Sequence, residues 1–251
     1  IMHGIVMGGG IGLSAHAQGG TRVVTEKARI AFPETTIGLI PDVGGTWLLS
    51  RAPAETGVYL GLLGAQMSAA DALYTGFADA LVEGERVPQL IDRLASDARP
   101  VTSIIKDLAR QSPASSLAGE LRAPIAEAFS APTVEGIAAA LQSLGTPWAQ
   151  KALADFAVRS PTALKTTLAA IRRTRGLANL EEALAQEFLL CTNLYEDGEF
   201  TEGVRALLVD KDKAPKWRPA SLADVPEARV ASMFAPLADG DRLAIPSPTK
   251  G

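Results

Sequence analysis

A run of glycines directly after a short apolar segment constrains the fold more than any other feature of this chain. Ile5–Met7 is apolar, Gly8-Gly9-Gly10-Ile11-Gly12 follows, and Leu13–Ala17 is made mostly of small and apolar residues. This order predicts a buried strand, a tight turn and a helix. Glycine lets the backbone approach a ligand closely and directs N–H groups at it. Three roles are open: phosphate binding, an oxyanion hole, or close packing of the helix on the strand.

The same glycines match a dinucleotide-binding fingerprint in the spacing Gly10-x-Gly12-x-x-Ala15. A dinucleotide-binding fold requires a helix after this turn and then a parallel strand that ends in an acidic residue. Here two short β-rich runs, Arg22–Thr25 and Arg29–Phe32, follow closely on one another. The dinucleotide interpretation is therefore disfavoured.

The hydrophobic pattern divides the chain into three parts. Residues 1–85 show an α/β pattern that ends in a strand at Ala80–Val82, whereas residues 86–219 carry apolar residues at helical spacing. Ser160-Pro161 predicts a helix start, because serine caps helices and proline suits the first helical position. Residues 220–251 are rich in Pro, Asp and Ala, and we expect a loosely ordered tail.

Composition excludes several classes of function. The net charge of −4 gives no bulk attraction for nucleic acid. No segment has the ~20 consecutive apolar residues that a membrane-spanning helix needs. Cys191 is the only cysteine, which excludes an intrachain disulfide and is typical of an intracellular chain. Because the sequence starts inside a predicted strand, we expect further residues upstream of Ile1.

Two carboxylates flank an apolar turn in the segment from Pro33 to Thr46. Glu34 and Asp42 each follow a proline, which restricts where the acid points. Apolar neighbours raise the pKa of a carboxyl group and make its ionised form a stronger base or nucleophile. Glu34 could instead cap a helix and Asp42 could begin a turn, as such residues often do. The residues by themselves leave both interpretations open.

Several segments together resemble the crotonase, or enoyl-CoA hydratase/isomerase, superfamily in sequence and order. The N-terminal resemblance rests on His3–Gly10, on Phe32-Pro33-Glu34 and on the run Gly38–Gly45. The C-terminal half is similar to the 3-hydroxyisobutyryl-CoA hydrolase branch of that superfamily, in the segments Ser160–Lys165, Phe200–Ala206, Asp210–Asp212 and Pro215–Trp217. The resemblance covers residues 1–219. It implies a crotonase-like ββα spiral core, incomplete at its N-terminus, with a helical C-terminal region.

The resemblance also implies roles for individual residues. Gly9 would donate one oxyanion-hole N–H, Glu34 would be the principal catalytic carboxylate, and Asp42 would hold a substrate hydroxyl or position water. Hydratases of the superfamily carry a second glutamate where this chain has Gly12, and commonly a glycine where it has Asp42. Both differences favour hydrolysis over hydration. The resemblance further assigns substrate-binding positions to Gly8, Gly10, Pro33 and Gly38.

The implied function is hydrolysis of a short β-hydroxyacyl-CoA thioester, with 3-hydroxyisobutyryl-CoA of valine breakdown as the implied substrate. No metal and no cofactor are expected, because coenzyme A is part of the substrate. An enoyl-CoA hydratase or isomerase, and a non-catalytic protein that binds CoA esters or a partner, remain alternatives. The expected compartment is the bacterial cytoplasm or the mitochondrial matrix. A homo-oligomer is possible, with neither nucleic acid nor a membrane as partner.

Overall fold

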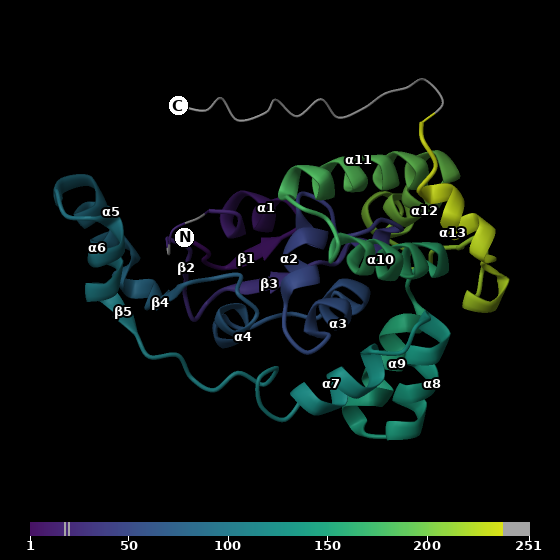
Figure 1. Ribbon diagram of the computed structural model, residues 1–251, viewed down its shortest axis with the longest axis horizontal. Helices are drawn as coiled ribbons and strands as arrows, with labels where there is room; N and C mark the ends of the chain where they lie inside the picture. Colours follow the sequence, from purple (N-terminus) through teal and green to yellow (C-terminus); the bar gives the residue numbers. More distant parts are fainter. Residues whose placement is uncertain (18, 20, 238–251) are drawn as a thin grey trace.

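The computed structural model describes residues 1–17, 19 and 21–237, and within them an α/β segment precedes a helical region, as the sequence predicts (Figure 1). The strands are β1 (Ile5–Met7), β2 (Val23–Val24), β3 (Arg29–Ala31), β4 (Ala80–Val82) and β5 (Ala109–Arg110). The first segment also holds the helices α1 (Gly9–Ala15), α2 (Gly45–Arg51), α3 (Thr56–Leu63) and α4 (Ala69–Tyr74) and the 3-10 turn η1 (Glu34–Ile37).

The strands form two small sheets. β1 pairs in parallel with β3, with Val6 opposite Ile30, and both side chains are buried. β4 lies between β2, to which it is parallel, and β5, to which it is antiparallel. The β1–β3 pairing places the start of α1 and the start of η1 side by side, because both follow the carboxyl ends of adjacent parallel strands.

Local signals explain where the nearby helices begin. Ser68 caps α4 by accepting a hydrogen bond from the Asp71 amide, and the Asp71 side chain accepts one from the Ser68 amide in return. This reciprocal arrangement satisfies donors that a helix start otherwise leaves unpaired.

Phe32, two residues before Glu34, packs edge-on against Phe77 with ring centroids 5.9 Å apart. The chain that carries Glu34 is therefore anchored in the hydrophobic core.

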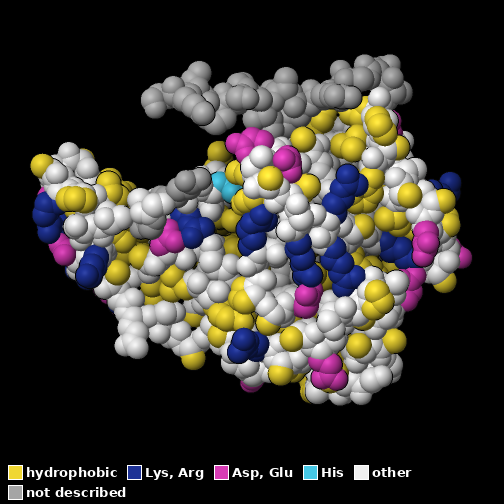
Figure 2. All heavy atoms as spheres, in the orientation of Figure 1, with side chains coloured by type: hydrophobic (Ala, Val, Ile, Leu, Met, Phe, Trp, Pro, Cys, Tyr) yellow, Lys and Arg dark blue, Asp and Glu magenta, His cyan; other side chains and the backbone are white. Residues whose placement is uncertain are grey.

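The later helices separate into an arm and a main helical layer. The arm, residues 87–110, contains α5 (Val87–Ser96), α6 (Val101–Leu108) and β5, and projects from the side of the molecule that holds β2 and β4 (Figure 1). Hydrophobic side chains are visible on its surface in Figure 2, and Ile91, Leu94 and Val101 are exposed. The main layer comprises α7 (Arg122–Phe129), α8 (Val134–Leu144), α9 (Pro147–Ala157), α10 (Pro161–Thr174), α11 (Leu180–Asp197), α12 (Glu199–Val204) and α13 (Glu227–Met233).

Three features differ from the sequence-based expectation. The predicted helical region 86–219 contains strand β5, which forms because its backbone pairs with β4. Helix α9 falls within that predicted helical region, but its own bounds were not predicted. The predicted loose tail begins at residue 220, yet η4 (Leu222–Asp224) and α13 fold there, with Val225 and Met233 buried. Residues 238–251 of that predicted tail lie outside the described residues.

Within the part of the chain that the structure describes, no helix combines the length and the apolar character needed to span a bilayer.

Candidate active site

The glycine turn and the Glu34 carboxyl group lie against one another. Gly8 adopts φ 50° and ψ −122° between β1 and α1, a conformation that suits glycine. A Cβ atom added to Gly8 would lie 3.0 Å from Glu34 Oε1. Gly9 is exposed and is the first residue of α1, so its amide has no acceptor within the helix. An exposed backbone donor and a carboxylate thus share one location.

Glu34 is buried without full compensation. The residue is 6% exposed, and its Oε2 atom has no hydrogen-bond partner. Burial raises the pKa of Glu34 to about 8, and the negative charges of Asp42 and Glu187 add to the effect. A buried polar atom without a partner costs about 1–3 kcal/mol. Such a cost at a single carboxyl group is typical of a site kept for chemistry.

Asp42 lies on a strained turn close to Glu34. The Gly45 amide donates to the Asp42 carbonyl over 2.7 Å, which closes the turn before α2. Burial raises the pKa of the half-buried Asp42 carboxyl group. The next residue, Val43, has φ 52°, a region that β-branched residues avoid. Neighbouring contacts must therefore hold this turn, because strain of this kind costs of order 1–3 kcal/mol.

The Val43 side chain fills the space beside Gly12. A Cβ atom on Gly12 would lie 2.7 Å from the Val43 Cβ and 2.9 Å from the Val43 carbonyl oxygen. A glutamate at position 12 would therefore require the Asp42 turn to move. In this chain the second glutamate expected of a hydratase is absent, and the turn that carries Asp42 occupies the room beside its position.

Sequence reasoning missed the residues that support this turn from a distance. Glu187 on α11 accepts hydrogen bonds from the Gly44 amide at 2.6 Å and the Thr46 amide at 2.8 Å. Cys191, one helical turn later, has its Sγ atom 4.0 Å from Asp42 Oδ2. His16 Nε2 lies 3.2 Å from the Val43 carbonyl oxygen, to which it must donate.

A signal for Glu187 was present in the sequence. It falls at helical spacing with the buried residues Ala183, Leu190 and Leu194. A carboxylate on the buried face of a helix needs a partner. The pattern alone does not say where that partner is.

The remaining predicted site residues divide between the surface and the interior. Gly10 is exposed beside Gly9, and Pro33 directly precedes Glu34. Gly38 adopts φ 74° at the end of η1, and a Cβ atom there would lie 2.5 Å from the Glu199 carbonyl oxygen. The α-carbon of Gly38 therefore lies against the backbone of α12. This close approach leaves no room for a side chain and explains the glycine. Its predicted contact with substrate stays a prediction.

Within residues 1–17, 19 and 21–237, no group of three His, Cys, Asp or Glu residues is arranged to hold a metal ion.

Comparison with known proteins agrees with this fold. The family model for enoyl-CoA hydratase/isomerase matches residues 1–234. The chain belongs to this family, within the crotonase superfamily, and its α/β part is the spiral core of that fold with a helical C-terminal region. A carnitinyl-CoA dehydratase structure from Mycobacterium thermoresistibile superposes with a TM-score of 0.87 at 43% identity, over 93% of this chain and 66% of its own. An enoyl-CoA hydratase structure from Rhodobacter sphaeroides 2.4.1 gives 0.86 at 39% identity, over 96% and 68%.

Curated relatives carry a different name from these structures. The chain is 37% identical to mitochondrial 3-hydroxyisobutyryl-CoA hydrolases from Homo sapiens and Rattus norvegicus, over 96% of this chain in both cases. It spans 64% of the length of each of these relatives.

Proposed function

We propose that the chain forms the carboxylate and glycine part of an acyl-CoA thioesterase site, with a short β-hydroxyacyl-CoA as substrate. Among such esters, 3-hydroxyisobutyryl-CoA is the proposed one, as the names of the curated relatives suggest. The observation that carries the proposal is the buried Glu34 carboxyl group against the Gly8–Gly9 turn, with Val43 filling the space beside Gly12. One reactive carboxylate suits hydrolysis, whereas hydration in this superfamily uses two.

The proposed chemistry follows from where charge develops. Attack on the thioester carbonyl carbon produces a tetrahedral oxyanion, which the Gly9 amide stabilises by donating to it. Ionised Glu34 then has two possible roles. It attacks the carbonyl carbon itself and forms an anhydride that water later opens, or it takes a proton from an attacking water. Collapse of the tetrahedral species expels the CoA thiolate in either route.

Asp42 suits a role at the acyl end of the substrate. Burial is the main cause of its raised pKa, so the carboxylate is a partly desolvated acceptor. Such an acceptor favours a substrate with a hydroxyl donor on its β-carbon. We therefore assign Asp42 to the hydroxyl group of the acyl chain, or to the water that it positions. No cofactor and no metal enter this scheme.

Hydration or dehydration of an enoyl-CoA is the second candidate, because the two superposable structures carry hydratase and dehydratase names. The protein should be incubated separately with 3-hydroxyisobutyryl-CoA and crotonyl-CoA, with free thiol and enoyl absorbance followed in both. Hydrolysis releases thiol, whereas hydration removes the enoyl absorbance without thiol. We expect thiol from the hydroxy ester. Loss of enoyl absorbance without thiol release would instead indicate a hydratase. No change in either assay would indicate a protein that binds CoA esters without turnover.

A single-turnover reaction in ¹⁸O-water separates the two roles of Glu34. Opening of an anhydride at the enzyme carbonyl transfers ¹⁸O into the Glu34 carboxyl group, which mass spectrometry of the peptide detects. Direct attack by water leaves the protein unlabelled and puts the label in the product acid.

A further inference from the structure

The turn that carries Asp42 is bound by a helix far away in the sequence. Glu187 accepts from the Gly44 amide at 2.6 Å and from the Thr46 amide at 2.8 Å, and the Thr46 hydroxyl donates to it at 2.5 Å. Glu187 is 2% exposed, so these bonds are shielded from water. One carboxylate thus satisfies three donors on both sides of Gly45.

Glu187 takes the place of a missing helix cap. Gly44 is the N-cap residue of α2 and has no side chain to accept from the first helical amides. Those amides have no intrahelical acceptor, and a carboxylate at a helix N-terminus is favoured by the helix dipole. The carboxylate from α11 supplies the acceptor that the local sequence lacks. Formation of the α2 start therefore depends on the docking of α11.

The turn needs this support because its own conformation is unfavourable. Val43, at φ 52°, separates Asp42 from Gly44, so the strained residue lies between the proposed substrate contact and the Glu187 anchor. On its other side the Val43 carbonyl accepts from His16. Without the anchor at Gly44, relaxation of Val43 would rotate Asp42.

We propose that Glu187 is a positioning residue, which holds the Gly44–Thr46 backbone and thereby fixes the direction of the Asp42 carboxyl group. The inference deepens the proposed thioesterase function and rests on it. Burial, together with the nearby Asp42 charge, raises the pKa of Glu187 to about 7, while the bonds from Thr46 and Gly44 oppose that rise. The three donors thus favour the ionised acceptor in an otherwise unfavourable environment.

Glu187→Gln is the direct test. The amide has the same size as the carboxylate, but its NH2 group would face the N–H of either Gly44 or Thr46, so one of these hydrogen bonds would be lost. Glu196→Gln is the matched control, since Glu196 is exposed on the same helix. Hydrogen exchange of the Gly44 and Thr46 amides is measured by NMR, and kcat and KM for thioester hydrolysis are measured separately. We expect about tenfold faster exchange and a kcat about 10- to 100-fold lower, with KM within about threefold, only in Glu187→Gln.

A second pair of variants covers the case in which Glu187→Gln does not fold. Thr46→Val removes the hydroxyl that donates to Glu187 and accepts from the Thr174 hydroxyl, and Thr46→Ser restores both bonds. A fall in kcat in the valine variant with recovery in the serine variant supports the positioning role. Unchanged amide exchange in Glu187→Gln, or faster exchange with unchanged kcat, would overturn it. If the wild-type protein releases no thiol, the proposed function fails, while the exchange rates still decide whether Glu187 anchors the turn.

Discussion

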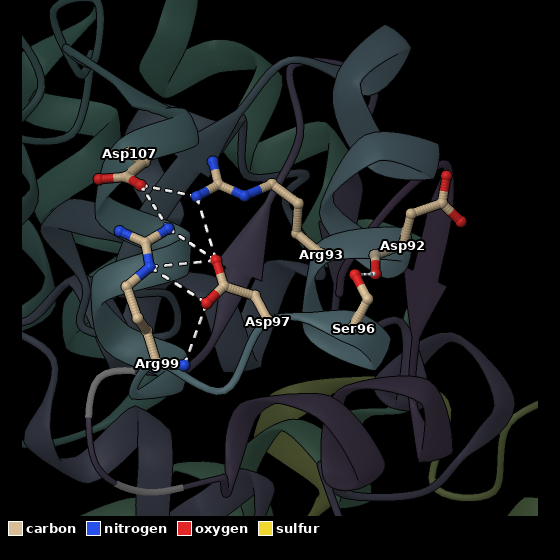
Figure 3. A network of polar contacts seen from close by, with 6 residues as sticks. All are labelled: Asp92, Arg93, Ser96, Asp97, Arg99 and Asp107. Atoms are coloured by element: carbon tan, nitrogen blue, oxygen red, sulfur yellow. Dashed lines mark hydrogen bonds and ion pairs between the residues drawn. The ribbon is translucent and has the colours of Figure 1, made fainter.

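Two clusters of charged side chains, one on the arm and one in the candidate site, differ in burial and in how their charges are compensated. On the arm, Arg93 and Arg99 each form ion pairs with Asp97 and Asp107, at distances between 2.7 and 3.5 Å (Figure 3). All four side chains are partly or largely exposed. In the candidate site, Glu34, Asp42 and Glu187 are all acidic and at least half buried. No basic side chain contributes to the shift of their pKa values.

The two clusters differ in their energetic cost, because only the buried carboxyl groups have lost water without gaining a counter-charge. Exposed pairs are screened by water and salt, and each contributes little to stability. Neighbouring arginines hold the pKa of Asp97 below its usual range, which is the ordinary result of pairing. The buried carboxyl groups have raised pKa values because burial removes water and supplies no counter-charge. The charges on the arm are exposed and paired, whereas the acids of the candidate site are buried without a basic partner.

The largest expected effect is on catalysis at Glu34. Glu34→Gln keeps the side-chain volume but removes the base or nucleophile, so thiol release from 3-hydroxyisobutyryl-CoA should fall by ~10³-fold or more. Steady-state kinetics with a thiol-reactive dye measures it. Glu196→Gln, exposed on α11, serves as the control and should retain full activity. Near-normal hydrolysis by Glu34→Gln would show that Glu34 is neither the base nor the nucleophile.

A smaller loss is expected at Asp42. Asp42→Asn retains the shape but weakens a hydrogen bond to the substrate hydroxyl, which corresponds to about 10- to 100-fold in kcat/KM. The loss should shrink for an acyl-CoA that lacks the β-hydroxyl, such as isobutyryl-CoA. An equal loss with both substrates would argue that Asp42 positions water instead.

The buried cluster should also make stability depend on pH. Because the pKa of folded Glu34 is raised to about 8 from 4.5, its proton stabilises the folded state at low pH. That contribution is lost as pH rises from about 4.5 through 8. Glu34→Gln should therefore gain roughly 4 kcal/mol in unfolding free energy over wild type between pH 5 and 9, measured by denaturant unfolding. A pH-independent difference would contradict the assigned pKa.

The smallest effect is expected on the arm. Asp97→Asn breaks the pairs with Arg93 and Arg99, but solvent already screens them. Thermal unfolding should shift little in low salt and not measurably in about 0.5 M NaCl. A clear, salt-independent loss of stability would show that the arm network is structural, and would weaken the contrast with the site.

Local sequence signals predicted many of the elements. The strand at Ala80–Val82 occurs with the predicted bounds, and residues 86–219 are largely helical, as their apolar spacing predicts. The Ser160 cap formed as expected, with its hydroxyl accepting from the Ala163 amide. The start of α9 was not identified, although Thr146-Pro147 carries a cap and a proline of the same kind.

The site was predictable in part for a related reason. Glu34, Asp42 and the glycines lie within one segment of sequence, so motif and spacing identify them together. Glu187 is 143 residues from Gly44, and Cys191 is 149 residues from Asp42. No local pattern encodes those contacts. They exist only once α11 packs beside α2.

The sequence by itself determined the α/β order, the helical second part and the residues able to do chemistry, because periodicity, caps and glycine turns act over a few neighbours. Tertiary structure alone decided that Glu34 is buried with a free oxygen, that Val43 fills the space beside Gly12, and that Glu187 caps α2. Burial and long-range hydrogen bonds depend on which surfaces meet, and desolvation, the main cause of the raised pKa values, arises only when they do.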